Sequence, residues 1–204
     1  MRVSKEKAAE NRHDILTAAA RLFREQGISA TGVDAIPKEA RLTHGAVYSQ
    51  FGSKEAIATE AIRLALQDSG RLWQRLVERN GTKKAFPAIV AAYLSRDHRD
   101  SPGRGCVTAA LGSEIARQPQ SVRAVFTEEL KAGLEFLAGV IPVDGPARRY
   151  EEAIAAFAGM VGALILARAV NDEPLSDRIL QVTAKRVTQS VKARKPAHRT
   201  QRSG

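Results

Sequence analysis

Residues 33–55, VDAIPKEARLTHGAVYSQFGSKE, form the stretch that decides the fold of this chain. Apolar side chains recur at the places where three short helices would touch, and the residues between them are small, hydroxylated or basic. The apolar positions are Val33, Ile36, Ala40, Leu42, Ala46, Val47 and Phe51. This spacing predicts two short helices, a tight turn and the start of a third helix, which is how a helix-turn-helix element that reads DNA is built.

The composition of the whole chain indicates a folded protein of one to two domains. The chain has 204 residues, of which 44% are hydrophobic, too many for a disordered protein. The longest uncharged run, residues 153–167, is shorter than the ~18 residues that cross a bilayer. The N-terminus is charged and shows no signal peptide, and the single Cys106 fits a reducing compartment. We therefore expect a soluble cytoplasmic protein without a membrane partner.

The net charge of +10 is distributed unevenly along the sequence. Residues 1–54 carry a net charge of +3, residues 55–184 are neutral, and residues 185–204 carry +7. Most of the basic excess therefore lies in a C-terminal tail, and such a tail is more often a solvated end than a nucleic-acid arm. We expect residues 195–204 to be a basic disordered tail.

Helical periodicity dominates the sequence, whereas the alternation typical of strands is nearly absent. We therefore expect an all-α protein of about nine helices, with a small N-terminal unit and a larger bundle. The first helix is expected over residues 5–26, ended by Gly27, and a long helix capped by Ser53 runs to about residue 80. Further helices are expected from 82 or 86 to 94, over 106–117, 121–140 and 147–171, and from Pro174 onward, with 100–105 as a loop.

Within the opening motif, the second short helix is expected at about residues 43–50, with its N-terminal residues facing base edges in the major groove. Thr43 can cap this helix through its hydroxyl, and Gly45 is small enough to allow close approach to the duplex. Tyr48 can bond a phosphate through its hydroxyl, Lys54 adds positive charge, and His44 is the most exposed candidate for a base contact. Tyr48 alone could also be a half-buried core aromatic, so the prediction rests on the joint spacing.

The first third of the chain resembles the TetR-type family of transcriptional regulators. The matching residues are Ile15-Leu16-x-Ala18-Ala19, Leu22-Phe23, Gly27, Thr31-x-Val33, Ile36, Ala40-x-Leu42-Thr43-x-Gly45-Ala46-x-Tyr48, Phe51 and Ser53-Lys54-Glu55. The resemblance covers about residues 10–60. It implies groove and phosphate contacts at Thr43, His44, Tyr48 and Lys54, and a further phosphate contact near Thr31 and Val33.

For the whole chain, this resemblance implies an all-α homodimer that binds operator DNA and responds to a small-molecule effector. Residues 1–53 would be the helix-turn-helix DNA-binding domain, and residues 54–194 the helical effector-binding and dimerisation domain. Two copies of the DNA-reading helix are needed because two half-sites of a palindromic operator lie ~34–36 Å apart on one face of the duplex.

Two residues depart from the family pattern. Pro37 stands where the family usually has Ala, and inside a helix it would cost ~3 kcal/mol. The cost falls if the helix starts late, with Asp34 as its cap and Pro37 in the first turn, so we expect a shortened or distorted first turn. Arg41 stands in the turn where the family usually has Gly, and a left-handed Arg costs on the order of 1 kcal/mol. Arg41 is a candidate phosphate contact that could compensate for this cost.

The C-terminal bundle offers candidate interface and effector-binding residues. Small residues on the helix expected at 147–171 would let another helix approach closely, although they also suit a tightly packed internal helix. The candidate dimer residues on this helix and the last one are Ala155, Gly159, Gly162, Leu166, Ile179 and Val187. The candidate effector-binding residues are Trp73, Phe86, Tyr93, Cys106, Phe126 and Met160, with Phe136 as a further aromatic. Few charges accompany these residues, so we expect a mostly apolar effector, although each is also an ordinary core residue type.

Cys106 has two interpretations. It follows Gly103-Arg104-Gly105 at the start of a helix, and a helix N-terminus and a nearby Arg both make a thiol more reactive. Cys106 could therefore sense an oxidant or electrophile, or it could be a small buried apolar residue.

We expect a ligand-responsive regulator, acting as a repressor, that needs no cofactor. A non-specific architectural DNA-binding protein is an alternative, resting on the basic tail. An enzyme is not expected: the four histidines lack metal-ligand spacing, and the sequence shows no catalytic residues and no Gly-rich phosphate loop.

Overall fold

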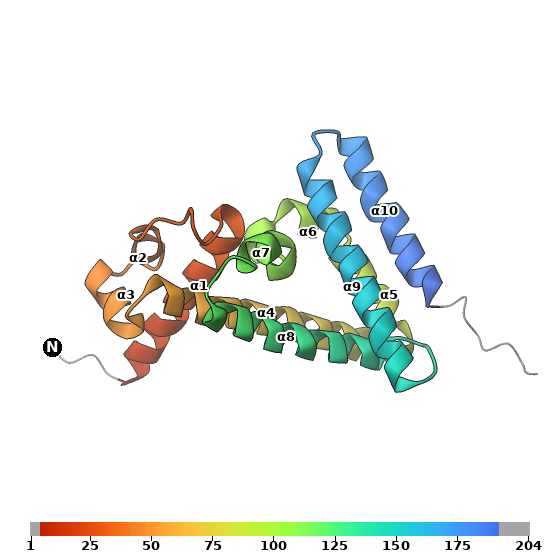
Figure 1. Ribbon diagram of the computed structural model, residues 1–204, viewed down its shortest axis with the longest axis horizontal. Helices are drawn as coiled ribbons and strands as arrows, with labels where there is room; N and C mark the ends of the chain where they lie inside the picture. The colour runs from red at the N-terminus through yellow and green to blue at the C-terminus, as the bar shows by residue number, and fades with distance from the viewer. Residues whose placement is uncertain (1–4, 192–204) are drawn as a thin grey trace, which may run out of the picture.

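The computed structural model describes residues 5–191 and is helical throughout, with ten α-helices and one short 3₁₀ helix in that range (Figure 1). The helices are α1 (Lys5–Gln26), α2 (Ala35–Glu39), α3 (His44–Phe51), α4 (Lys54–Asn80), α5 (Thr82–Tyr93), α6 (Arg96–Asp100), η1 (Pro102–Arg104), α7 (Val107–Ile115), α8 (Gln120–Val140), α9 (Pro146–Ala169) and α10 (Glu173–Ser190). The expected all-α fold is confirmed. The predicted tail, residues 195–204, lies outside the described residues.

The helix that the sequence did not predict is α6. The segment RDHRD has no apolar periodicity, so nothing in it indicates a helix. The helix forms because the Ser95 hydroxyl accepts a hydrogen bond from the His98 N–H at 3.1 Å and caps its first turn. Residues 100–105, expected as a loop, contain the 3₁₀ helix η1.

The molecule has two apolar cores that α4 connects. The first core packs α1, α3 and the beginning of α4 around Phe23, Val47 and Ile57, and it continues into α7 and the beginning of α8. The second core joins the end of α4 with α5, α8, α9 and α10 around Phe86, Leu137 and Met160. In Figure 1, α4 and α8 run side by side, α9 crosses their far end, and α10 packs along α9. The helix α7 therefore lies between the N-terminal unit and the bundle.

Helix α9 is the one described helix that is long and apolar enough to cross a membrane by length and composition, with a mean hydropathy of 1.6 over the best window. In this structure it contributes Ala153, Met160 and Leu164 to the second core and packs against α8 and α10. These contacts account for part of its apolar composition, because Ile154, Ile165 and Leu166 of the same helix are exposed.

The start of α2 confirms the expected late entry of the chain into this helix. The helix begins at Ala35, so Pro37 occupies its first turn, where the missing N–H breaks no intrahelical bond. Asp34 is the N-cap residue of this helix, as expected, but its backbone is already helical, with φ −93° and ψ −10°, and its side chain makes no cap bond. Val33, counted among the apolar contacts by its spacing, is instead 52% exposed, because the helix starts after it.

Candidate functional site

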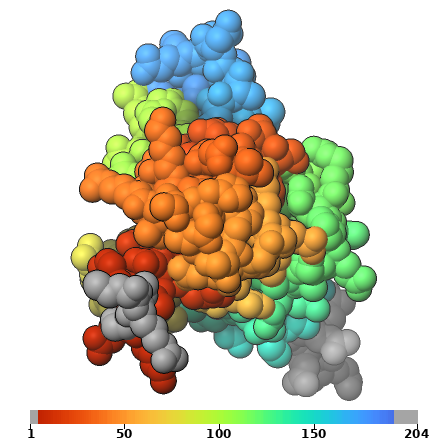
Figure 2. Space-filling model, turned by 90° about the vertical axis from the view of Figure 1, so that its left-hand side faces the viewer, coloured from red at the N-terminus to blue at the C-terminus, as the bar shows by residue number. Residues whose placement is uncertain are grey.

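The helix α3 projects its N-terminal end from the molecule. Figure 2 shows α2 and α3, in orange, at the front of the face formed by the N-terminal unit. Thr43 caps α3 as predicted, because its hydroxyl oxygen accepts a hydrogen bond from the Ala46 N–H at 3.2 Å. Thr43, His44 and Gly45 are all exposed, and an added Cβ at Gly45 would meet nothing within 4 Å. The first turn of α3 is therefore a free convex surface of the size that enters a major groove.

Buried contacts on its opposite side hold α3 in place. Val47 and Phe51 enter the first core. The guanidinium of Arg12, from α1, lies 4.2 Å from the centre of the Phe51 ring and bonds both carboxylate oxygens of Glu60 in α4, at 2.5 and 2.6 Å. Arg12 thus joins α1, α3 and α4, which fixes the direction in which the exposed turn points.

Tyr48 does not have the geometry that the sequence suggested. Its ring stacks on His44, with ring centroids 4.4 Å apart and planes inclined by 22°. Its hydroxyl is buried and has no hydrogen-bond partner among the described residues. Burial, and secondarily the negative charge of Asp34, raise the Tyr48 pKa. In this arrangement Tyr48 supports His44, and its hydroxyl does not face the surface where a phosphate would lie.

Thr31 and Lys54 hold the turn that leads to α2 through side-chain hydrogen bonds to backbone carbonyls. Thr31 is 1% exposed, and its hydroxyl donates to the Gly27 carbonyl at 2.6 Å. The Lys54 ammonium donates to the Thr31 carbonyl at 2.6 Å and to the Ser29 carbonyl at 3.4 Å. The Thr31 side chain points inward, so the phosphate contact expected near Thr31 and Val33 stays a prediction for the backbone and the neighbouring exposed residues of this turn. Lys54 is half-buried and holds the turn while its charge stays near the surface.

Arg41 adopts the left-handed backbone that the sequence predicted for this position. Its φ of 56° is the one positive value for a non-glycine residue between residues 5 and 191. Arg41 is exposed, as are Val33 and Lys38. These three residues extend the exposed surface from α3 across α2 and the turn, and they add two positive charges to it.

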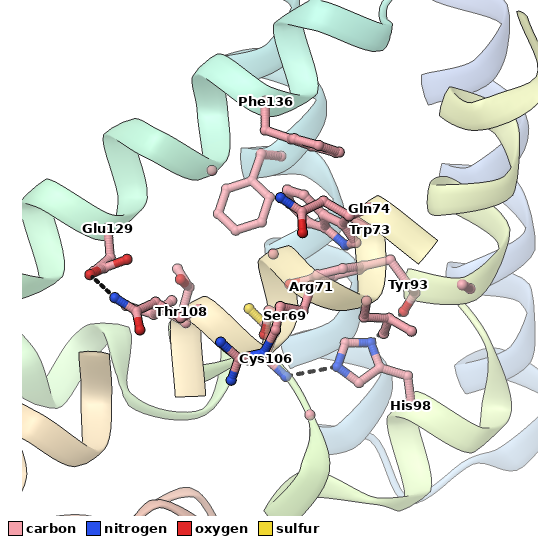
Figure 3. Close-up of a pocket in the computed structure, with 18 of the residues that line it drawn as sticks. Ser69, Arg71, Trp73, Gln74, Tyr93, His98, Cys106, Thr108, Glu129 and Phe136 are labelled. Carbon is pink, nitrogen blue, oxygen red and sulfur yellow. Dashed lines mark hydrogen bonds between the residues drawn. The ribbon is translucent and has the colours of Figure 1, made fainter. Parts of the chain in front are cut away.

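A cavity of about 1370 Å³ lies in the bundle between α4, α5, α7 and α8 (Figure 3). Three of the predicted effector-binding residues, Trp73, Tyr93 and Cys106, line it. The other three do not: Phe86 and Met160 are buried in the second core, and Phe126 packs against the first. Phe136 lines the cavity as expected. Phe157, His98 and Thr108 also line it, and no sequence pattern indicates them, because their positions depend on how the helices pack.

The His98 ring lines this cavity and bonds backbone groups through both of its nitrogens. Its Nε2 accepts a hydrogen bond from the Cys106 N–H at 2.8 Å, while Nδ1 lies 2.7 Å from the Tyr93 carbonyl, to which its N–H donates. This pair of partners requires the neutral ring. Burial lowers the His98 pKa, the bond to Tyr93 acts against this, and the charge of Arg168 lowers it further. Cys106 is a buried N-cap residue of α7 as predicted, and its backbone is fixed by His98.

Two polar contacts connect this region to the N-terminal unit. Arg24 of α1 bonds the Gly103 carbonyl in η1, and Glu114 of α7 accepts hydrogen bonds from the backbone N–H groups of Ile28 and Ser29, at 2.9 and 2.6 Å. Burial of Glu114 acts to raise its pKa, but the hydrogen bonds from Ser29 and Ile28 outweigh it, so the pKa lies below its usual value. The segment from η1 to α7 therefore contacts both the cavity and the helix-turn-helix unit.

One face of α9 and α10 carries apolar side chains that nothing in the described chain covers. Its exposed large residues are Ile154, Ile165, Leu166, Leu175 and Val182. Of the predicted dimer residues, Ala155, Gly159 and Leu166 are exposed, while Gly162 and Ile179 are half-buried. Val187 is buried and packs toward Gly159 within the bundle, so it does not belong to this face.

Comparison with known proteins identifies the N-terminal unit. Residues 15–61 match the family described as bacterial regulatory proteins, tetR family. Over 71 residues, 35% of this chain, the sequence is 39% identical to the HTH-type transcriptional regulator AcrR of Shigella flexneri. Over 129 residues, 60% of this chain, it is 27% identical to the uncharacterised HTH-type transcriptional regulator YxaF of Bacillus subtilis. The matched regions span 33% and 65% of those relatives, which is less than two thirds of either.

The fold of the whole chain also has solved counterparts. The crystal structure of a TetR-family transcriptional regulator from Cytophaga hutchinsonii has a TM-score of 0.75 and 20% sequence identity, and the match covers 93% of this chain and 98% of that one. These relatives are named as transcriptional regulators, which is a non-enzymatic function. At this identity the structural likeness concerns the fold, so the ligand and operator have to be argued from the residues themselves.

Proposed function

We propose that this chain is an effector-responsive repressor that acts as a homodimer in the cytoplasm. Residues 15–61 and the fold make it a helix-turn-helix transcriptional regulator of the tetR family. The observation that carries the proposal is the first turn of α3, which is capped, exposed and held from behind by Val47, Phe51 and Arg12. A rigid helix with small and hydroxylated residues at its exposed N-terminus suits base reading.

Dimerisation would occur through the uncovered face of α9 and α10. Large exposed side chains such as Leu166 and Val182 gather there, and an apolar patch of this kind is typical of a subunit interface. A twofold axis through this face would present two copies of α3 to two half-sites of a palindromic operator.

Effector control would pass through the segment from η1 to α7. This segment borders the cavity at Cys106 and contacts the N-terminal unit through Gly103 and Glu114. An effector that fits the cavity better when this segment is displaced would favour a dimer in which the two α3 helices no longer match the half-site spacing.

Selection of random DNA duplexes on the purified protein tests this function. We expect the selection to enrich a palindromic duplex that the protein binds as a dimer. A Thr43→Ala, His44→Ala double variant should lose this binding. A family of unrelated duplexes bound with equal affinity and a steep salt dependence would instead identify a non-specific architectural protein. A second selection for compounds that release the winning duplex then identifies effectors.

A sensor function of Cys106 is a second candidate, because the cavity places the thiol where a small reactive molecule can reach it. A Cys106→Ser variant separates the two mechanisms. If an electrophile releases the wild-type protein from its operator but not this variant, the thiol is the sensor. Release of both proteins at the same concentration would contradict the sensor function.

A further inference from the structure

Two hydroxyl groups in the wall of the cavity have no hydrogen-bond partner. They belong to Tyr93, at the end of α5, and to Thr108, in the first turn of α7. No nitrogen or oxygen of the described residues bonds either oxygen. The polar neighbour of the Tyr93 hydroxyl is the Cys106 thiol, which is a weak hydrogen-bonding group. A buried polar group without a partner costs about 1–3 kcal/mol, so a ligand oxygen that bonds either hydroxyl would gain affinity.

The Tyr93 hydroxyl is held in its position by the packing of its ring. The side chain is 5% exposed, its ring packs edge-on against His98 at 4.7 Å, and it meets the Phe157 ring at 6.0 Å between centroids. Burial, together with the nearby Cys106, raises the Tyr93 pKa well above its usual value. The group therefore remains a protonated hydroxyl, which can donate a hydrogen bond to an acceptor in the cavity.

Three aromatic side chains, Trp73, Phe136 and Phe157, also contribute to the walls of the cavity. The Trp73 ring lies 6.0 Å from Phe157 in an edge-to-face arrangement and 6.3 Å from Phe136. Gly133 lies opposite Trp73 on α8, where an added Cβ would come within 4.0 Å of the indole ring. Figure 3 shows Trp73 and Phe136 at one end of the cavity and Cys106 with His98 at the other. Such walls favour the faces and edges of a planar ring system.

The charged side chains that line the cavity are placed where they do not select a charged ligand. Arg71, Arg75, Asp97 and Arg104 are exposed, and they belong to the rim. Glu129 is less exposed but is paired, because its carboxylate accepts a hydrogen bond from Gln67 at 2.9 Å and lies 3.5 Å from Arg63. His98 is neutral with both ring nitrogens occupied. An ionic group placed beside the buried Tyr93 hydroxyl would therefore lose its hydration, while the exposed Arg71, Arg75 and Arg104 would attract it only weakly through water.

We infer that the effector is an uncharged, planar aromatic compound bearing a hydroxyl or carbonyl oxygen, with its rings against Trp73 and Phe136 and its oxygen bonded to Tyr93 or Thr108. The inference rests on the proposed function, since it specifies the compound that would release the DNA. The binding of such a compound can be tested without DNA, because the contacts that define the ligand lie within the bundle.

Binding can be observed at the cavity itself, because Trp73 is the single tryptophan of the chain. Protein labelled with 5-fluorotryptophan gives one fluorine resonance, whose shift reports occupation beside this ring. Three probes of nearly equal size are titrated: 2-naphthol, naphthalene and 2-naphthoate. We expect 2-naphthol to bind about 10-fold more tightly than naphthalene, which is the effect of satisfying one buried hydroxyl, and 2-naphthoate to bind most weakly.

Matched variants assign the preference to the two hydroxyls. We expect the Tyr93→Phe and Thr108→Val variants, singly and together, to retain their affinity for naphthalene. In these variants the ratio of the affinity for 2-naphthol to the affinity for naphthalene should fall toward one. Tyr150→Phe, which removes a hydroxyl that does not line the cavity, should keep the full advantage. Equal affinity for the two neutral probes, tightest binding of 2-naphthoate, or a preference that survives in the double variant would overturn the inference. Operator selection on the unlabelled protein is a separate measurement, so a failure of the proposed function is distinguishable from a failure of this ligand class.

Discussion

Arg24 in α1 donates two hydrogen bonds to the Gly103 carbonyl in η1, from Nε at 2.8 Å and from Nη2 at 2.5 Å. Burial lowers the Arg24 pKa, so this guanidinium is taken out of water for a backbone partner. An added Cβ at Gly103 would meet the Glu25 carboxylate and the Arg21 side chain, so a larger residue there would have to displace Glu25. Cys106, at the cavity, follows three residues later. A displacement of this segment therefore reaches the N-terminal unit directly.

Replacing Arg24 by Met should weaken this connection while keeping most of the apolar stem. We expect a loss of about 1.5–3 kcal/mol in the free energy of unfolding, the usual contribution of hydrogen bonds to a charged group. We also expect operator affinity to persist while more effector is needed to release the DNA. Urea denaturation and operator titrations measure the two effects. Arg123→Met, at an exposed position of α8 outside the cavity, is the control, and an equal loss in both variants would contradict a specific role for Arg24.

His98 should make stability depend on pH below neutrality. Burial holds its folded-state pKa below the ordinary 6.5, so the unfolded chain binds the proton first as the pH falls. The stability that neutral His98 contributes is complete about one pH unit above 6.5 and declines as the pH falls from there toward the folded-state pKa. We expect this decline between pH 7.5 and 5 in the wild type and its absence in His98→Gln. The exposed His13→Gln variant should behave as the wild type, and an unchanged decline in His98→Gln would contradict the assignment.

Local signals predicted most of the helices correctly. Thr43 and Ser53 cap α3 and α4 through their own hydroxyls, and Gly27 and Gly81 stand at positive φ after α1 and α4. Such ends depend on neighbours within a few residues, so a sequence pattern can detect them. The helix α6 was missed because its stability depends on contacts made after folding: the Arg168 side chain bonds the carbonyls of His98 and Arg99.

The functional residues were predicted less well, because their roles depend on side-chain direction in three dimensions. Thr31 and Tyr48 match the family pattern in type and spacing, yet the turn before α2 folds so that Thr31 faces the core and the Tyr48 hydroxyl is buried. Glu114 lies 85 residues from its partner Ser29 in sequence, and no local pattern indicates that pair. The cavity was predicted only in part for the same reason, since its walls come from α4, α5, α6, η1, α7, α8 and α9.

A charge on the face of α9 and α10 should prevent dimerisation. Leu166 is 56% exposed, more than any other of the large apolar residues of this face. Leu166→Glu would place a carboxylate in a buried interface without a partner, so we expect a monomer at micromolar concentration and a loss of cooperative operator binding. Analytical ultracentrifugation measures the oligomeric state. Leu72→Glu, an exposed leucine on α4, should remain dimeric, and a dimeric Leu166→Glu variant would place the interface elsewhere.

Arg41 combines backbone strain with a free positive charge, and the two can be separated by substitution. Its φ of 56° costs on the order of 1 kcal/mol for a side chain with a Cβ, and glycine at this position removes that cost. If the guanidinium contacts a phosphate, Arg41→Gly should weaken operator binding and reduce the slope of log affinity against log salt by about 0.9, the value for one phosphate contact. Arg41→Lys keeps both the charge and the strained backbone, so it should retain the wild-type slope. Binding titrations across a salt series compare the three proteins. An unchanged slope in Arg41→Gly would show that the strained residue makes no phosphate contact, and that its position in the turn has another cause.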